Sequence, residues 1–215
     1  MSESTKNLQA IVDRLRQIIS AKDVAREKAL PLCRQAIRDC ARAIRSIHRH
    51  EFQPAEELLQ SARHELTEAK AALAEHRDLS HTAFLRDAQK EYAEGTITLA
   101  LVSGKQLPDP DELDVEPAAY LNGMGEAIGE IRRYLLDGMR KGDLSRGEEL
   151  LDAMDEIYST LVTIDFPDAL TGGLRRTTDM VRGVLERTRS DLTLGMRQGD
   201  LERRLDKLGE SIHNT

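Results

Sequence analysis

The sequence predicts an all-α fold, a bundle of amphipathic helices in a single domain spanning residues 1–215. Aromatic residues make up only 3% of the 215 residues, and tryptophan is absent, whereas β-sandwiches and barrels of this size need more aromatic and β-branched side chains. Apolar residues recur at helical spacing along most of the chain. One segment, residues 95–102, is rich in β-branched residues. A single strand would have no partner, so we expect this segment to be helical.

The first half of the chain predicts three or four helices after a short polar tail of residues 1–6. Apolar residues follow helical spacing over residues 8–19 and again over 24–47, which indicates two helices or one interrupted helix. Pro31 either kinks the second run or marks its first turn, because proline lacks the backbone donor of a helix interior. Pro54 opens the next helix, which continues to Leu73. Ser80 or Thr82 caps another that extends through residues 95–102.

The second half predicts a long loop and three further helices. Residues 104–117 hold three prolines and five acids, which is typical of a loop. Pro117 starts a helix, residues 142–146 form a turn with a helix cap, and the next helix reaches about Val162. A further helix covers residues 168–196, and a short charged helix at about residues 200–213 finishes the chain. The architecture expected is a helical bundle.

Charge, cysteine content and hydropathy narrow the function classes. The formal net charge of −7 excludes a basic coat over the whole surface but allows a local basic stripe. Cys33 and Cys40 lie seven positions apart in a helical pattern, about 10 Å, which is too far for a disulfide. No apolar run approaches the roughly 18 residues of a membrane span. We therefore expect free thiols, no membrane association and a cytoplasmic location.

Acidic residues form the first candidate site. Asp87, Glu91 and Glu94 are spaced i, i+4, i+7, so they share one face of a helix, and Glu126 and Glu130 repeat the i, i+4 spacing on the helix that follows the loop. If the two helices pack antiparallel, four or five carboxylates face one another. Mg²⁺ prefers such oxygen ligands and activates water for phosphodiester hydrolysis. The alternative is an ordinary solvated pair of helix faces.

Basic residues form the second candidate site. Five arginines recur at steps of four, four, three and four on the helical face opposite the apolar one, and they form what we call the arginine stripe: Arg34, Arg38, Arg42, Arg45 and Arg49. Such a stripe repels itself unless something negative covers it. A nucleic-acid phosphate backbone would do so, as would acids of a neighbouring helix or subunit. His48 and His50 sit beside Arg49 and could extend the stripe.

The chain resembles the translin family of translin and Trax, and it is similar to an archaeal-type, stand-alone member. The segments that carry the resemblance run in family order: REKALPLCRQAIRDCARAI from Arg26, EYAEG at residues 91–95, LDVEPAAYLNGMGEAIGEIRR at residues 113–133, KGDLSR at residues 141–146, and LRRTTDMVRGVLERTRSDLTLGMRQ at residues 174–198. The most specific is YLNGMGEAIGE, which is similar to a Tyr-Leu-x-Gly-x-x-(Asp/Glu)-x-x-x-Glu pattern of both family branches.

The resemblance implies a seven-helix protomer that assembles into a closed homo-oligomeric shell, usually an octamer, and binds single-stranded RNA and also single-stranded DNA. The Glu-Tyr-x-Glu motif is Trax-like, and it implies a Mg²⁺-dependent endoribonuclease, with Mn²⁺ as an alternative ion. Carried over, Glu91, Glu94 and Glu126 are the catalytic acids, and the same three with Glu130 are the metal ligands. Glu126 stands where the Trax-like pattern has Asp, which lengthens that ligand arm. By its position one turn before the pair, Asp87 would either support these ligands or be an outer ligand itself.

The sequence leaves two competing interpretations open. One is a non-catalytic translin-like oligomer that binds single-stranded RNA or DNA. The other is an architectural oligomer whose arginine stripe pairs with acids of a neighbouring subunit. Phosphate contacts predict RNA affinity that falls steeply with salt, whereas the architectural interpretation predicts no RNA binding.

Overall fold

The computed structural model describes residues 5–79 and 81–213, and every regular element in these residues is helical. The α-helices are α1 (Leu8–His48), α2 (Phe52–Leu73), α3 (Ala83–Val102), α4 (Pro110–Leu113), α5 (Pro117–Arg140), α6 (Gly147–Leu161), α7 (Asp168–Thr171) and α8 (Leu174–His213), and a 3₁₀ turn, η2, covers Arg77–Leu79. The predicted all-α fold is confirmed. None of these helices is long and apolar enough to cross a membrane.

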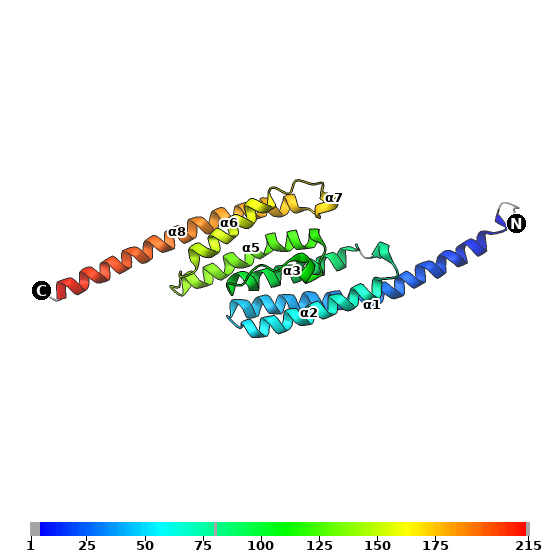
Figure 1. Cartoon of the computed structure of the whole chain (residues 1–215), viewed down its shortest axis with the longest axis horizontal. Coiled ribbons are helices and arrows are strands. Elements are labelled where there is room, and N and C mark those ends of the chain that lie inside the picture. The colour runs from blue at the N-terminus through cyan, green and yellow to red at the C-terminus, as the bar shows by residue number, and fades with distance from the viewer. Residues whose placement is uncertain (1–4, 80, 214–215) are drawn as a thin grey trace.

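The long helices form three layers (Figure 1). The hairpin of α1 and α2 is one outer layer, α3 and α5 form the middle layer, and α6 and α8 form the other outer layer. The core runs through all three layers, and α1 contributes mainly small side chains, including Ala29, Cys33 and Ala36, which let α2 and α3 approach closely. Cys33 and Cys40 are buried and free, as predicted.

The first helix is a single unit. Pro31 lies inside the 41-residue α1, so the two predicted runs form one helix, and it continues through the interruption that the sequence predicted. Pro31 is exposed, while Ala29 and Cys33 on either side of it are buried in the core. Packing on both sides of the proline therefore outweighs the lost backbone hydrogen bond.

The helix count differs from the seven expected. The described residues hold six helices of 15 or more residues and two single-turn helices of four residues. The first short helix, α4, lies inside the predicted loop, where Asp109 and Glu112 form a reciprocal capping box. The separate charged helix expected at about residues 200–213 is wrong, because α8 continues without a break through this region.

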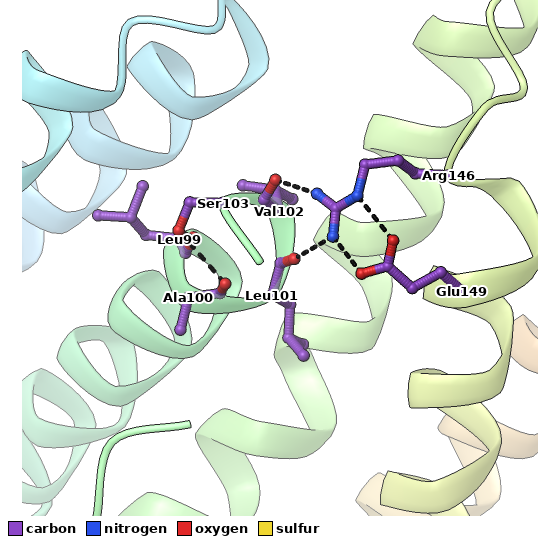
Figure 2. A network of polar contacts seen from close by, with 7 residues as sticks. All are labelled: Leu99, Ala100, Leu101, Val102, Ser103, Arg146 and Glu149. Atoms are coloured by element: carbon purple, nitrogen blue, oxygen red, sulfur yellow. Dashed lines mark hydrogen bonds and ion pairs between the residues drawn. The ribbon is translucent and has the colours of Figure 1, made fainter. Parts of the chain in front are cut away.

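The β-branched segment, residues 95–102, forms the last two turns of α3, as expected. Ile97, Leu99 and Val102 are buried there, so tertiary packing decides against strand propensity. At the end of α3, the guanidinium of Arg146 donates hydrogen bonds to the carbonyls of Leu101 and Val102 and pairs with Glu149 of α6, as Figure 2 shows. Arg146 thus satisfies carbonyls that have no partner within α3.

Candidate metal and nucleic-acid site

The predicted acids lie on two helices that run in the same direction. The start of α3 approaches the start of α5, where the Gln89 side-chain oxygen accepts from the Glu116 backbone amide, and the end of α3 meets Arg146, just beyond α5. The antiparallel arrangement expected from the sequence is therefore wrong. The connection over residues 103–116 returns along the bundle before α5 begins, so both helices run in the same direction along its long axis (Figure 1).

A glycine of α5 brings the two acidic faces together. A Cβ atom at Gly123 would lie 2.7 Å from the backbone oxygen of Lys90 and 3.0 Å from the backbone nitrogen of Glu94. Both of these atoms belong to the α3 backbone and cannot rotate away. Gly123 thus permits backbone contact between α3 and α5, and this contact places Glu126, one turn later, beside the acids of α3.

Three carboxylates form a compact group, which we call the glutamate triad: Glu91, Glu94 and Glu126. One oxygen of each lies within 4.8 Å of the others, and all three side chains are half-buried. In a Mg²⁺ octahedron with Mg–O distances of about 2.1 Å, opposite ligands are about 4.2 Å apart and adjacent ligands about 3 Å apart. The triad can therefore hold one divalent cation when its side chains draw closer together.

The electrostatics of the triad favour a cation. Burial, together with the charges of Glu91 and Glu126, raises the pKa of Glu94 to about 8. Burial also raises the pKa of Glu91, with Glu126 adding to the shift and Lys90 opposing it. Carboxylates held together against their mutual repulsion gain the most from a positive ion between them.

Lys90 of α3 supplies one positive charge at this site. Its Nζ lies 2.7 Å from a Glu126 oxygen and 3.6 Å from a Glu91 oxygen. Although burial by itself lowers the pKa of Lys90, the hydrogen bond to Glu126 and the neighbouring acids outweigh that effect, and the pKa is raised. Lys90 is therefore a cation that holds two members of the triad in place.

The remaining predicted acids, Glu130 and Asp87, lie outside the triad. Glu130 pairs with His48 of α1, whose Nε2 is 2.5 Å from a Glu130 oxygen, although its charge still contributes to the raised pKa of Glu94. His48 does not extend the arginine stripe, because its side chain is only 6% exposed. Asp87 is exposed and lines a cleft next to Glu126.

All five side chains of the arginine stripe are exposed, four of them on α1 and that of Arg49 directly after the helix ends. Arg42 donates to the buried Asp39, with 3.0 Å between Nη1 and Oδ1, and Arg38 donates to Gln35. A surface groove between α1 and α2 is lined by Arg42, Arg45 and Arg49. This groove shares no lining residue with the cleft at Glu126, so the structure does not bring the arginine stripe and the triad into one pocket.

Sequence reasoning missed the basic residues nearest to the triad. A cleft containing Glu126 is also lined by Arg86 and Lys90 of α3 and Arg176 of α8. Arg86 and Lys90 stand at i and i+4 on the same helix as Glu91, and this spacing was a usable signal. Arg176 comes from a distant part of the chain, and only the packing of α8 against α5 brings it here.

The fold is similar to two solved structures of archaeal C3PO, a member of the translin family. AfC3PO and its complex with duplex RNA are each 33% identical to this chain over 87% of it and 97% of the AfC3PO chain, with TM-scores of 0.78 and 0.79. The chain belongs to the translin family. No protein-family model matches it.

The chain is also similar to two further proteins. The apo structure of NeC3PO is 17% identical and has the same fold, with a TM-score of 0.72 over 91% of this chain and 98% of that one. The uncharacterized protein MJ0175 of Methanocaldococcus jannaschii is 29% identical over 195 residues, which are 87% of this chain and 85% of that protein.

Proposed function

We propose that this translin-family protein is a metal-dependent endoribonuclease that acts on RNA, and single-stranded RNA in particular. The observation that carries the proposal is the glutamate triad, whose oxygens converge within 4.8 Å between two backbone segments in direct contact. The complex of AfC3PO with duplex RNA supports RNA as the ligand class.

In this proposal Glu91, Glu94 and Glu126 hold Mg²⁺, or Mn²⁺ as an alternative. When bound there, the ion would lower the pKa of a coordinated water and would stabilise the charge that develops on the phosphate oxygens. Lys90 keeps Glu126 and Glu91 oriented, and the His48–Glu130 pair fixes a fourth carboxylate one turn along α5. Glu130 or a triad member orients the water and accepts its proton. A bond between the water oxygen and phosphorus then forms as the ester bond to the ribose oxygen breaks, and this leaving oxygen takes up a proton from solvent water.

The nuclease proposal is tested with end-labelled single-stranded and duplex RNA. We expect the purified protein to cut the single strand with Mg²⁺ and to leave it intact in EDTA, and Glu126→Gln to lose cleavage because the ion loses a charged ligand. Glu116→Gln, at the start of the same helix, is the matched control and should cut as the wild type does. Cleavage that continues in EDTA would refute the assignment.

One observation favours a second candidate, a binding protein without turnover. Lys90 already pairs with two of the three triad acids, so part of the negative charge that would attract Mg²⁺ is compensated within the chain. In this case the protein holds single-stranded RNA or DNA through the arginine stripe (Arg34, Arg38, Arg42, Arg45 and Arg49). RNA binding without products in Mg²⁺ would establish it.

We also infer a homo-oligomer, an octameric shell being the form that the family resemblance implies. The first half of α1 extends beyond the bundle (Figure 1) and exposes apolar side chains at a seven-residue repeat: Leu8, Ile11, Leu15 and Ile18, with Val12 and Ile19 beside them. This spacing is typical of a helix that packs against another helix. A second copy of the same face is a matching partner, since the repeat is self-complementary.

The oligomer is tested by mass in solution. We expect the wild-type protein to sediment as a multiple of its 24.1 kDa chain, and the double variant Leu15→Asp/Ile18→Asp to dissociate, because burying two carboxylates in an apolar contact is unfavourable. Gln17→Asp adds a charge on the opposite face of α1 and should keep the wild-type mass. A wild-type monomer would contradict the inference.

A further inference from the structure

A cleft next to the triad opens between α3, α5 and the corner where α7 meets α8. It measures about 660 Å³, and Glu126 forms part of its wall. Three basic residues line it: Arg86, Lys90 and Arg176. Asp87 is the other acid of its lining, so the positive charges outnumber the negative ones. A cleft that combines a triad member with three cations is suited to an anion held beside the triad.

Two of these cations have no polar partner within the described residues. Lys90 pairs with Glu126, but within the described part of the chain Arg86 and Arg176 have neither an ion pair nor a side-chain hydrogen bond. Both are exposed. Of the nine other exposed arginines beyond α2 in these residues, five have an acidic partner, for example Arg189 with Asp155, and four do not: Arg175, Arg187, Arg197 and Arg204. An arginine without a partner retains all five of its donors for a ligand.

The wall of the cleft is rigid where the two arginines attach. The Asn122 side chain donates to the carbonyls of Ala118 and Thr171 and accepts from the Thr177 hydroxyl, which ties α5 to the α7–α8 corner. Gly172 turns the corner with a φ of +62°, and a Cβ there would lie 4.0 Å from Cδ of Arg86. Arg86 therefore packs against the corner that leads into α8 and to Arg176.

The start of α8 at this corner also adds an electrostatic field that favours an anion. The 40-residue α8 begins at Leu174, directly after Gly172 and Gly173, which both line the cleft. The first turn of a long helix carries a partial positive charge and free backbone N–H groups. Guanidinium groups and a helix start on one wall are a recurrent arrangement for phosphate.

We propose that Arg86 and Arg176 bind a phosphate of the RNA strand next to the phosphate that is cleaved at the triad. This inference rests on the proposed nuclease function and names the residues that position its substrate. The cleft shares Glu126 with the triad, whereas the groove at the arginine stripe does not, so a phosphate in the cleft fixes the register of the strand over the triad. Arg86 and Arg176 are positioning residues in this scheme.

The test compares the double variant Arg86→Ala/Arg176→Ala with Arg175→Ala/Arg187→Ala, which removes the same charge from exposed arginines outside the cleft. The dissociation constant for a labelled single-stranded RNA is measured in EDTA over a range of salt concentrations, on full-length protein of wild-type mass. Cleavage is then measured with Mg²⁺ to separate KM from kcat.

We expect the cleft variant to bind RNA about 10-fold or more weakly at low salt, and its log–log salt slope to fall by about 0.7 for each phosphate that the variant no longer neutralises. KM should rise while kcat changes less than about threefold, and Arg86→Lys/Arg176→Lys should recover part of the affinity. If Arg86 and Arg176 only stabilised the fold, replacing them would not change the salt dependence of RNA binding.

Three results would overturn the inference: an unchanged affinity and slope in the cleft variant, equal losses in the control variant, or no RNA binding by the wild type. Failure of the wild type to cleave RNA in Mg²⁺ would refute the nuclease function alone. The salt slope in EDTA would then still decide whether the cleft binds phosphate.

Discussion

Glu94→Gln is expected to lower Mg²⁺-dependent RNA cleavage by at least about 100-fold and, at the same time, to stabilise the metal-free protein at pH 8. The activity is lost because the ion loses a charged ligand. The stability rises because a neutral amide removes a buried carboxylate that repels Glu91 and Glu126. Opposite changes in activity and stability are the expected result of a strained functional site.

The sign of the stability effect follows from the pKa of Glu94, which is about 8 in the folded chain against an ordinary value of 4.5. Between these values the folded protein binds a proton that the unfolded chain has released. The wild-type free energy of unfolding therefore falls as the pH rises from about 4.5 to 8, by on the order of 4 kcal/mol. Glu94→Gln should lack this fall, as chemical denaturation in EDTA at a series of pH values would show.

Glu65→Gln is the matched control. Glu65 is a half-buried carboxylate on α2 whose pKa is raised by burial and by Asp39, yet it is not part of the triad. We expect it to retain Mg²⁺-dependent cleavage. Adding Mg²⁺ should raise the unfolding temperature of the wild type and of Glu65→Gln, and much less that of Glu94→Gln. Equal Mg²⁺ stabilisation of all three proteins would place the metal elsewhere.

Gly123→Ala is expected to destabilise the fold by about 1–3 kcal/mol and to lower cleavage by about 10- to 100-fold. The new methyl group would lie 2.7 Å from the Lys90 backbone oxygen and 2.9 Å from the Ala93 Cβ, so α3 and α5 must separate. That separation moves Glu126 away from Glu91 and Glu94. Thermal unfolding and the cleavage assay measure the two effects.

Gly129→Ala on the same helix is the control for helix propensity. Among the described residues, and apart from the neighbouring backbone of α5 itself, no heavy atom lies within 4 Å of a Cβ at Gly129. Alanine favours a helix interior over glycine by about 0.5–1 kcal/mol, so this variant should be slightly more stable than the wild type. If Gly123→Ala were as stable and as active as Gly129→Ala, close contact between α3 and α5 would not be what forms the site.

Local sequence patterns predicted most elements and failed where long-range packing decides. Apolar periodicity predicted α2, α3, α5 and α6. Because no second strand was available for pairing, residues 95–102 were correctly predicted to be helical. Periodicity could not show that α1 continues through Pro31, because burial of Ala29 and Cys33 decides that. It also could not give the relative direction of α3 and α5, which depends on the path of the connection between them.

The sequence by itself determined the helical class and the free cysteines, because these depend on composition and on spacing along one helix. Spacing also nominated five acids on two helices, and the family resemblance selected Glu91, Glu94 and Glu126 among them. Only the tertiary structure decided that Lys90 pairs with these acids, that His48 holds Glu130, and that Arg176 reaches the cleft beside Glu126. The physical reason is distance along the chain. Arg176 and Glu126 are fifty positions apart, and no local pattern encodes the backbone contact at Gly123 and the packing of α8 on α5 that bring such residues together.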